Sequence, residues 1–270
     1  MGQSKHNNMS FLEHLEELRW HVIRSIYAVI ICAFVCFLFP EVIFNVILMG
    51  PYDLGNFPTY NFLCNAGTYI GLETGFCGES FPNYDVINRT GYGQFMSHFS
   101  SSIYLGIILS FPYIIFQIWR FIAPGLLSNE KIKSGILISS SSSLFGIGIL
   151  FGYYVILPLS LNFLLNYSLS ESISNQLDLS NIISTSLTIP LATGIAFQLP
   201  IVIYFLSKAG IVDSKSLIKY RRYTILIVLI IAALATPPDI FSQILLSIPI
   251  LILYQIGIFI SRIIEKRRSK

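Results

Sequence analysis

Two long stretches of this chain, residues 134–170 and residues 179–207, carry no Asp, Glu, Lys or Arg. Each is longer than the ~20 apolar residues with which an α-helix crosses the hydrocarbon core of a bilayer. Only 11% of all residues are charged, against roughly a quarter in a soluble domain. A soluble protein of this kind would need several helices buried on all sides. The sequence therefore predicts an all-α integral membrane protein.

Six apolar segments predict six transmembrane helices, at residues 22–39, 103–122, 135–157, 182–206, 223–236 and 240–260. We interpret residues 1–270 as a single six-span membrane domain with a long external loop at residues 45–102. Fourteen residues separate Arg222 from Pro237, so the fifth helix is about 21 Å long at 1.5 Å per residue. Because hydrocarbon is about 30 Å thick, we expect two short C-terminal spans that form a tight hairpin.

The basic residues are strongly segregated between the two sides of this six-span arrangement. Sixteen of the 17 lysines and arginines fall on one side, and Arg89 alone falls on the other. Cytoplasmic loops of membrane proteins carry an excess of Lys and Arg. The sequence therefore predicts that both termini are cytoplasmic (N-in/C-in). Residues 1–24 are too rich in charge for a cleavable signal peptide.

The N-terminal segment, residues 1–21, is predicted to be a cytoplasmic amphipathic helix with an acidic side. Glu13, Glu16 and Glu17 are three and four residues apart, so they are neighbours on a helix surface. Such a cluster suits a partner with guanidinium groups, because a carboxylate can accept bidentate hydrogen bonds from arginine. The alternative is pairing within the helix, for example between Glu17 and His21.

Several residues inside the apolar segments predict contacts between helices. Gly148 and Gly152 have GxxxG spacing, which lets a neighbouring helix approach closely. Gln198 lies midway along the fourth segment, where a polar side chain needs a partner or a water-filled cavity. Asp239 and Gln243 lie about one helical turn apart and can share a face of the last helix.

The four cysteines are interpreted in pairs. Cys32 and Cys36 lie one turn apart in the first span, where packing is the expected role. Cys64 and Cys77 lie in the external loop and can form a disulfide if the loop faces an oxidising compartment. No C-x-x-C pair is present, so no zinc or thioredoxin-like site is predicted.

Three segments together resemble one known family. Residues 14–19, HLEELR, resemble the H-L-x-E-L-R signature of the signal-peptide-receptor family of the twin-arginine translocase, also called the Sec-independent protein translocase. Residues 121–131, FIAPGLLSNEK, resemble the first cytoplasmic loop of that family, and residues 236–243, TPPDIFSQ, resemble its turn between the fifth and sixth helices. The order and spacing of these segments match along nearly the whole chain.

This resemblance implies a glove-shaped bundle of six helices. We expect it in the cell inner membrane, and an organellar inner membrane is the alternative. The resemblance also implies a signal-peptide receptor and scaffold subunit, in a translocase that exports folded proteins on the proton-motive force. The implied partners are twin-arginine signal peptides, single-span subunits of the A and B type, further copies of the chain and the lipid bilayer, and no nucleic acid. Neither enzymatic activity nor a cofactor is expected, and no P-loop of the form G-x-x-x-x-G-K-[ST] is present.

The family pattern also implies which residues bind the signal peptide. Glu17 and Glu130 would contact the two arginines, while Arg19 and Phe121 would support that surface and Glu16 would border it.

A second set of positions is linked by the resemblance to assembly with partner subunits: Pro51, Gln198, Asp239 and Gln243. The family usually has a glutamate where this chain has Gln198. An amide can form hydrogen bonds but cannot take up a proton. Contact with a partner helix is therefore compatible with Gln198, whereas a proton relay through it is not.

Three other classes of protein fit the sequence less well. A proton-coupled small-solute transporter would need a buried ionisable pair near the membrane midplane, where this chain has only Gln198 and serines. A membrane enzyme would need a nucleophile with a base or a metal cluster, and the histidines are not expected to gather, because three are N-terminal and His98 falls across the membrane. A structural subunit of a respiratory complex would leave the acidic cluster unexplained.

Overall fold

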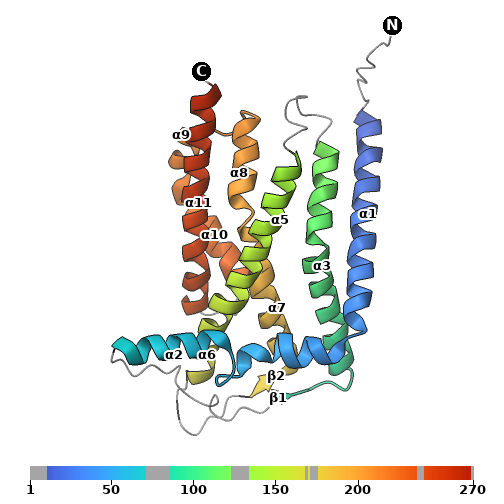
Figure 1. Cartoon of the computed structure of the whole chain (residues 1–270), viewed down its shortest axis with the longest axis vertical. Coiled ribbons are helices and arrows are strands. Elements are labelled where there is room, and N and C mark those ends of the chain that lie inside the picture. The colour runs from blue at the N-terminus through green and yellow to red at the C-terminus, as the bar shows by residue number, and fades with distance from the viewer. Residues whose placement is uncertain are drawn as a thin grey trace. The chain divides into compact units, whose positions relative to one another are not determined.

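The structure is a computed structural model, and it describes residues 11–70, 86–122, 134–167, 170, 176–235 and 240–268. Nearly all of the regular structure is helical (Figure 1). In chain order, the elements are α1 (Phe11–Phe37), the π-helix η1 (Val42–Leu48), the 3-10 helix η2 (Gly50–Tyr52), α2 (Pro58–Ile70), β1 (Val86–Ile87), α3 (Gly93–Ile122), α5 (Ser134–Phe151), the π-helix η4 (Gly152–Ile156), α6 (Leu157–Asn166), β2 (Leu177–Asp178), α7 (Leu179–Ala196), α8 (Leu199–Lys208), α9 (Ser214–Lys219), α10 (Arg221–Ala235) and α11 (Ile240–Arg268).

Within the described residues, five helical stretches are long and apolar enough to cross a bilayer: Leu15–Phe37, Gly93–Phe121, Leu137–Asn166, Leu179–Lys208 and Ser242–Arg267. They confirm the predicted class, a helical membrane protein with several spans. The predicted fifth span corresponds to α10, which has 15 residues. At 1.5 Å per residue α10 is about 22 Å long, shorter than the hydrocarbon core of a typical bilayer.

The prediction of a short last span is wrong. α11 has 29 residues and continues well past residue 260, where the apolar segment ends. Hydropathy reports where a helix leaves the membrane, not where it stops being a helix. Residues 261–268 contain Arg, Lys, Glu and Ile but no Gly or Pro, so their helix propensity carries α11 onward.

The segment predicted as an external loop, residues 45–102, is largely helical where the structure describes it. It contains α2, and α3 begins at Gly93 rather than at residue 103. Residues 93–102 include Gln, His and several serines, which lowers their hydropathy without preventing a helix. The helix therefore extends beyond its most apolar part.

The contacts divide the chain into two compact units. Unit 1 consists of Met1–Leu38 and Ser102–Ser142, and unit 2 consists of Phe39–Ser101 and Ser143–Lys270. In unit 1, α1 meets α3 at a glycine: a Cβ added to Gly106 would lie 2.8 Å from the Cα of Ala33. The absence of a side chain at Gly106 therefore permits the close approach of these two helices.

In unit 2, small residues form a seam between α7 and the helical stretch made of α5 and η4. A Cβ added to Gly148 would lie 2.8 Å from the Cα of Gly194, and one added to Gly152 would lie 2.7 Å from the Cα of Pro190. The predicted GxxxG contact is confirmed, and the neighbouring helix is α7. A similar contact joins α8 to α11, where Gly257 faces Ile203.

The segment between η1 and α2 packs onto η4 and α6 through tyrosines. Tyr60 is fully buried, and its hydroxyl lies 3.0 Å from the carbonyl oxygen of Pro51 and 3.1 Å from that of Pro158. Tyr153 donates a hydrogen bond of 2.9 Å to the carbonyl oxygen of Ile47 in η1. Through backbone carbonyl groups, these bonds join α2 to η2 and α6, and η4 to η1.

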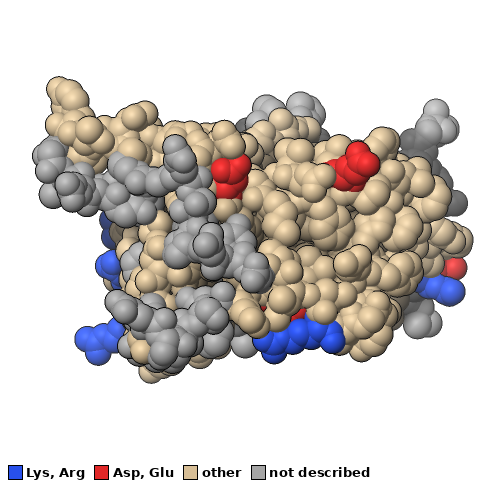
Figure 2. Space-filling view, turned by 90° about the horizontal axis from the view of Figure 1, so that it is seen from below, with Lys and Arg blue, Asp and Glu red and all other residues tan. Residues whose placement is uncertain are grey.

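Unit 2 has a basic end and an opposite end that carries a short parallel pairing of β1 with β2. In Figure 1, α9 and the last turns of α11 lie at one end, while α2, β1 and β2 lie at the other. The first end includes Lys215, Lys219 and Arg262, and the second includes Asp178 in β2. Figure 2 views the molecule from below, and most of the described surface there is uncharged. This separation matches the segregation of basic residues in the sequence.

Candidate functional site

A buried polar cluster joins α1 to α3 in unit 1. Only 6% of His21 and 2% of Gln117 are exposed. Nδ1 of His21 lies 2.7 Å from Oε1 of Gln117, and Nε2 of Gln117 donates a hydrogen bond to the hydroxyl of Tyr113. Because a carboxamide oxygen only accepts hydrogen bonds, Nδ1 of His21 must carry the proton. The two buried polar side chains thereby satisfy each other across the helix contact.

The same histidine contacts Phe121, a residue that the sequence assigns to the signal-peptide surface. The ring centroids of His21 and Phe121 are 6.1 Å apart, with an edge-to-face angle of 64°. Phe121 is half-buried and lies in the last turn of α3. His21 is therefore held by Gln117 and Phe121 of α3, and this contact was missed by the sequence interpretation, which considered His21 only as a partner of Glu17.

Glu17 lies one helical turn before His21 on α1. The residue is half-buried, and its Oε2 atom is buried with no hydrogen-bond partner among the described residues. A buried polar atom without a partner costs roughly 1–3 kcal/mol, and more when it is charged. Oε2 of Glu17 is thus an acceptor that a donor from another molecule can satisfy.

The other predicted signal-peptide residues of α1 are at the surface. Glu16 and Arg19 are both exposed and flank Glu17 along the helix. Glu130 lies outside the described residues, so its assignment remains a prediction. The structure therefore brings Glu17, His21 and Phe121 together through one turn of α1 and the end of α3.

The residues predicted for subunit assembly lie on different elements of unit 2. Pro51 is buried in η2, where its carbonyl oxygen accepts from Tyr60. Gln198 is half-buried at the break between α7 and α8, and Pro200 is the second residue of α8. Nε2 of Gln243 donates a hydrogen bond of 2.9 Å to the carbonyl oxygen of Leu229, so it ties α11 to α10. Asp239 lies outside the described residues.

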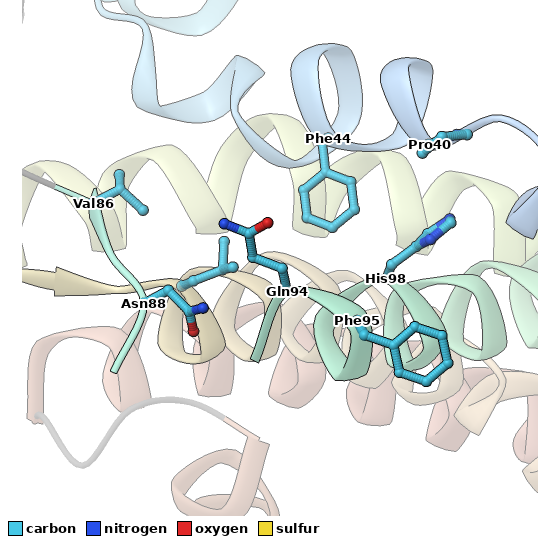
Figure 3. A pocket seen from close by; sticks show the side chains of 8 residues that line it. Pro40, Phe44, Val86, Asn88, Gln94, Phe95 and His98 are labelled. Carbon is cyan, nitrogen blue, oxygen red and sulfur yellow. The ribbon is translucent and has the colours of Figure 1, made fainter. Parts of the chain in front are cut away.

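A cavity of about 490 Å³ lies in unit 2 and has a mixed polar and apolar lining. Figure 3 shows Phe44 of η1, Gln94 and His98 of α3, and Asn88 before α3 around this space. The ring centroids of Phe44 and His98 are 6.0 Å apart. None of the predicted site residues that the structure describes lines this cavity.

The described residues contain no group of three His, Cys, Asp or Glu side chains placed to hold a metal ion. Cys32 and Cys36 are free thiols, and Cys64 is disulfide-bonded. Cys77, the fourth cysteine of the sequence, lies outside the described residues.

The apolar spans define a multi-pass helical membrane protein. The half-buried Glu17, one helical turn from the His21–Gln117 contact, provides a candidate acceptor site for a cationic partner. The family model for Sec-independent protein translocase protein (TatC) matches residues 13–249. The chain therefore belongs to the TatC family of Sec-independent protein translocase proteins.

Individual relatives agree along almost the whole chain. The TatC protein of Blattabacterium sp. subsp. Periplaneta americana is 38% identical over 266 residues, which cover 98% of this chain and 100% of that protein. The TatC protein of Aquifex aeolicus is 33% identical over 263 residues, covering 97% and 98%. That of Escherichia coli K12 is 33% identical over 259 residues, covering 96% and 90%. A crystal structure of the twin arginine translocase receptor TatC matches with a TM-score of 0.76 and 33% identity, covering 94% of this chain and 100% of that one.

Proposed function

We propose that this chain, a translocase subunit by family, is the receptor that binds twin-arginine signal peptides and the scaffold on which the translocase assembles. The observation that carries the proposal is the buried, unpartnered Oε2 of Glu17, one turn from the His21–Gln117 contact. The related crystal structure, described as that of a translocase receptor, supports the same role. The translocase would move folded proteins and draw on the proton-motive force.

In this proposal Glu17 and Glu130 each accept hydrogen bonds from one arginine of the signal peptide. A guanidinium group presents a planar set of donors that matches a carboxylate, whereas the ammonium group of lysine is a point charge. Phe121 offers an aromatic face or edge close to the same place, and aromatic rings attract guanidinium groups. Glu16 adds negative charge on the exposed side, and Arg19 borders the surface.

We further propose six spans in the cell inner membrane, arranged as a glove-shaped bundle with both termini cytoplasmic. The six spans are the five long stretches together with α10. Support comes from the basic residues, which gather at the end of unit 2 that holds α9 and the last turns of α11. Cytoplasmic segments attract such an excess of Lys and Arg.

Assembly with single-span subunits of the A and B type and with further copies of the chain is proposed at Pro51, Gln198, Asp239 and Gln243. The contact between Gln243 and Leu229 suggests how one of these residues acts. A substitution at Gln243 would first alter the packing of α10 on α11, and through that packing any surface that a partner helix uses. Gln198 would contribute hydrogen bonds, not proton transfer.

The test is binding of a signal peptide to the purified full-length chain in lipid nanodiscs. One peptide carries the arginine pair and its control carries two lysines. A guanidinium can donate a second, parallel hydrogen bond to the same carboxylate, which the ammonium group of lysine does not match. Since a hydrogen bond to a charged group contributes about 1.5–3 kcal/mol, we expect the arginine peptide to bind about tenfold or more tightly. Glu17→Gln and Glu130→Gln should each remove most of that preference.

Glu41→Gln is the control, because Glu41 is an exposed carboxylate that lies just beyond the opposite end of α1 from Glu17. This variant should keep the preference for arginine. Equal binding of the two peptides to the unaltered chain would overturn the receptor proposal.

A further inference from the structure

The helix α2 (Pro58–Ile70) is held firmly against the rest of unit 2 but lies across the direction of its spans. Figure 1 shows α2 running sideways at the end of unit 2 where α6 ends, while α7 and α11 run lengthwise. Tyr60 anchors α2 through the carbonyl oxygens of Pro51 and Pro158, and Oγ1 of Thr59 donates to the carbonyl oxygen of Tyr154. The orientation of α2 within unit 2 is therefore fixed by tertiary contacts.

The side chains of α2 divide into three sectors around the helix. Tyr60 and Gly67, seven residues apart, are buried, and Tyr60 contacts Pro51 and Pro158 of unit 2. Phe62 and Tyr69, also seven residues apart, are 71% and 94% exposed. At 3.6 residues per turn, the remaining exposed sector holds three polar side chains: Asn61, Asn65 and Thr68. The helix therefore has a protein-facing sector, an aromatic sector and a polar sector.

The composition of α2 indicates which partner its aromatic sector contacts. The helix has no charged residue, so an electrostatic partner has nothing to recognise. A helix that lies across the spans with one apolar and one polar exposed sector matches the pattern of helices at a membrane interface. Phenylalanine and tyrosine rings at such a level bury their apolar atoms in lipid, and the tyrosine hydroxyl stays in contact with water.

The contacts of α2 also attach it to one of the membrane-spanning stretches. Its anchors Tyr154 and Pro158 belong to the membrane-spanning stretch Leu137–Asn166, 12 and 8 residues before its last residue. Tyr154 is itself partly exposed and stacks on Phe57, with ring centroids 5.5 Å apart. The exposed Tyr154 therefore lies beside the start of α2, where Phe57 itself is buried.

We propose that the aromatic sector of α2, formed by Phe62 and Tyr69, lies in the headgroup layer of the bilayer and contacts lipid. The polar sector faces water. α2 is then an interfacial helix that fixes the depth and tilt of unit 2 in the membrane. This role is separate from signal-peptide binding and does not depend on it.

Tryptophan fluorescence can test this placement on the full chain. Trp20 and Trp119, the two native tryptophans, are replaced by phenylalanine, and Phe62→Trp or Tyr69→Trp is introduced. The protein is placed in phosphatidylcholine vesicles whose acyl chains are brominated close to the headgroup, and in matched vesicles without bromine. Because aromatic rings at an interface reach the upper acyl chains, the bromine should lower the emission of both reporters by about twofold or more.

Asn65→Trp is the matched control, since Asn65 is exposed on the polar sector of the same helix. Its emission should be insensitive to brominated lipid and should be quenched by acrylamide in the water. If Phe62→Trp and Tyr69→Trp behave like Asn65→Trp, the aromatic sector faces water and the proposal is overturned. If neither quencher reaches them, another protein surface or a second copy covers the sector, and the proposal is equally overturned. Each reporter substitution at Phe62 or Tyr69 keeps an aromatic ring at an exposed position, and thermal unfolding checks that every variant is folded.

Discussion

Nδ1 of His21 donates a hydrogen bond of 2.7 Å to Oε1 of Gln117, and this bond links two apolar helices of unit 1. The same histidine ring meets Phe121 at the end of α3. Removing one partner of a buried hydrogen bond leaves the other partner buried without a hydrogen bond, which destabilises the fold. The bond therefore connects the fold of unit 1 directly to the turn of α1 that carries Glu17.

We expect His21→Ala and Gln117→Ala to lower the free energy of unfolding by about 1 kcal/mol each, in line with polar contacts between membrane helices. The double variant should cost less than the sum of the two, because both changes break the same bond. Reversible unfolding in mixed micelles measures these values. Ser25→Ala is the control, since Ser25 bonds only to the carbonyl oxygen of His21 on its own helix. If the losses in unfolding free energy of the two single variants add up to that of the double variant, the bond contributes nothing to stability.

The glycine seam of unit 2 gives a prediction with an internal control. A Cβ on Gly148 would lie 2.8 Å from the Cα of Gly194, whereas one on Gly146 would meet nothing within 4 Å. We expect Gly148→Ala to destabilise the protein by about 1–3 kcal/mol through overpacking. Gly146→Ala should be neutral or slightly stabilising, because alanine favours a helix by up to about 1 kcal/mol. Thermal unfolding in detergent compares the two, and equal effects would show that α7 can move away from the seam.

One carboxylate of α11 binds the start of α9, while Tyr254 of α11 donates a hydrogen bond of 2.8 Å to the carbonyl oxygen of Leu217 in α9. Glu265 accepts hydrogen bonds from the backbone N–H of Ser214 and from its hydroxyl, the latter at 2.7 Å. Loss of a charged hydrogen bond costs about 1.5–3 kcal/mol, so Glu265→Ala should speed amide hydrogen exchange in α9 by about tenfold or more. Arg267→Ala, an exposed position two residues further along α11, should leave the exchange unchanged. An unchanged rate in Glu265→Ala would show that other contacts hold α9.

The start of α9 should also respond to pH. Oδ1 of Asp213 accepts a hydrogen bond of 3.2 Å from the backbone N–H of Ser216. Hydrogen bonding from Ser216, with the larger effect from its side chain, lowers the pKa of Asp213 below the ordinary value of 3.8. A carboxyl group with a lowered pKa stabilises the folded state above its ordinary pKa, and this contribution is lost as pH falls through the folded value.

Protection factors of the α9 amides, which correct for the intrinsic exchange rate, should therefore fall as the pH drops below 3.8. Asp213→Asn should remove this pH dependence, because asparagine caps a helix about as well as aspartate and does not titrate in this range. The same fall in the asparagine variant would assign the effect to another group.

The long spans could be predicted because length without charge is a nearly sufficient signal for a membrane helix. Gly148 and Gly152 could be interpreted for a similar reason, since their spacing alone places both on one face of a helix. The bond between His21 and Gln117 could not be predicted in the same way. Gln117 is a single polar residue within an apolar run, and its partner is 96 residues away in sequence, so only the packing of α1 on α3 reveals the pair.

The region between the first two spans was the least predictable. α2 combines Asn, Thr, Gly and aromatic residues, and this composition favours a helix only weakly. Its anchoring comes from tertiary contacts such as those of Tyr60, which local sequence does not report. The π-helices η1 and η4 escaped prediction for a related reason, since they depend on how neighbouring segments fit together and not on a repeating pattern.

The buried hydroxyl of Tyr60 has a consequence for the order of events during synthesis. Its second acceptor, the carbonyl of Pro158, lies 98 residues later in the chain. At roughly 5–20 residues per second, the ribosome adds Pro158 about 5–20 s after Tyr60. Throughout that interval α2 is already made but lacks the surface that holds it. Final docking of α2 is therefore a late step of biogenesis, and it can occur only after the helix that contains Pro158 has been inserted.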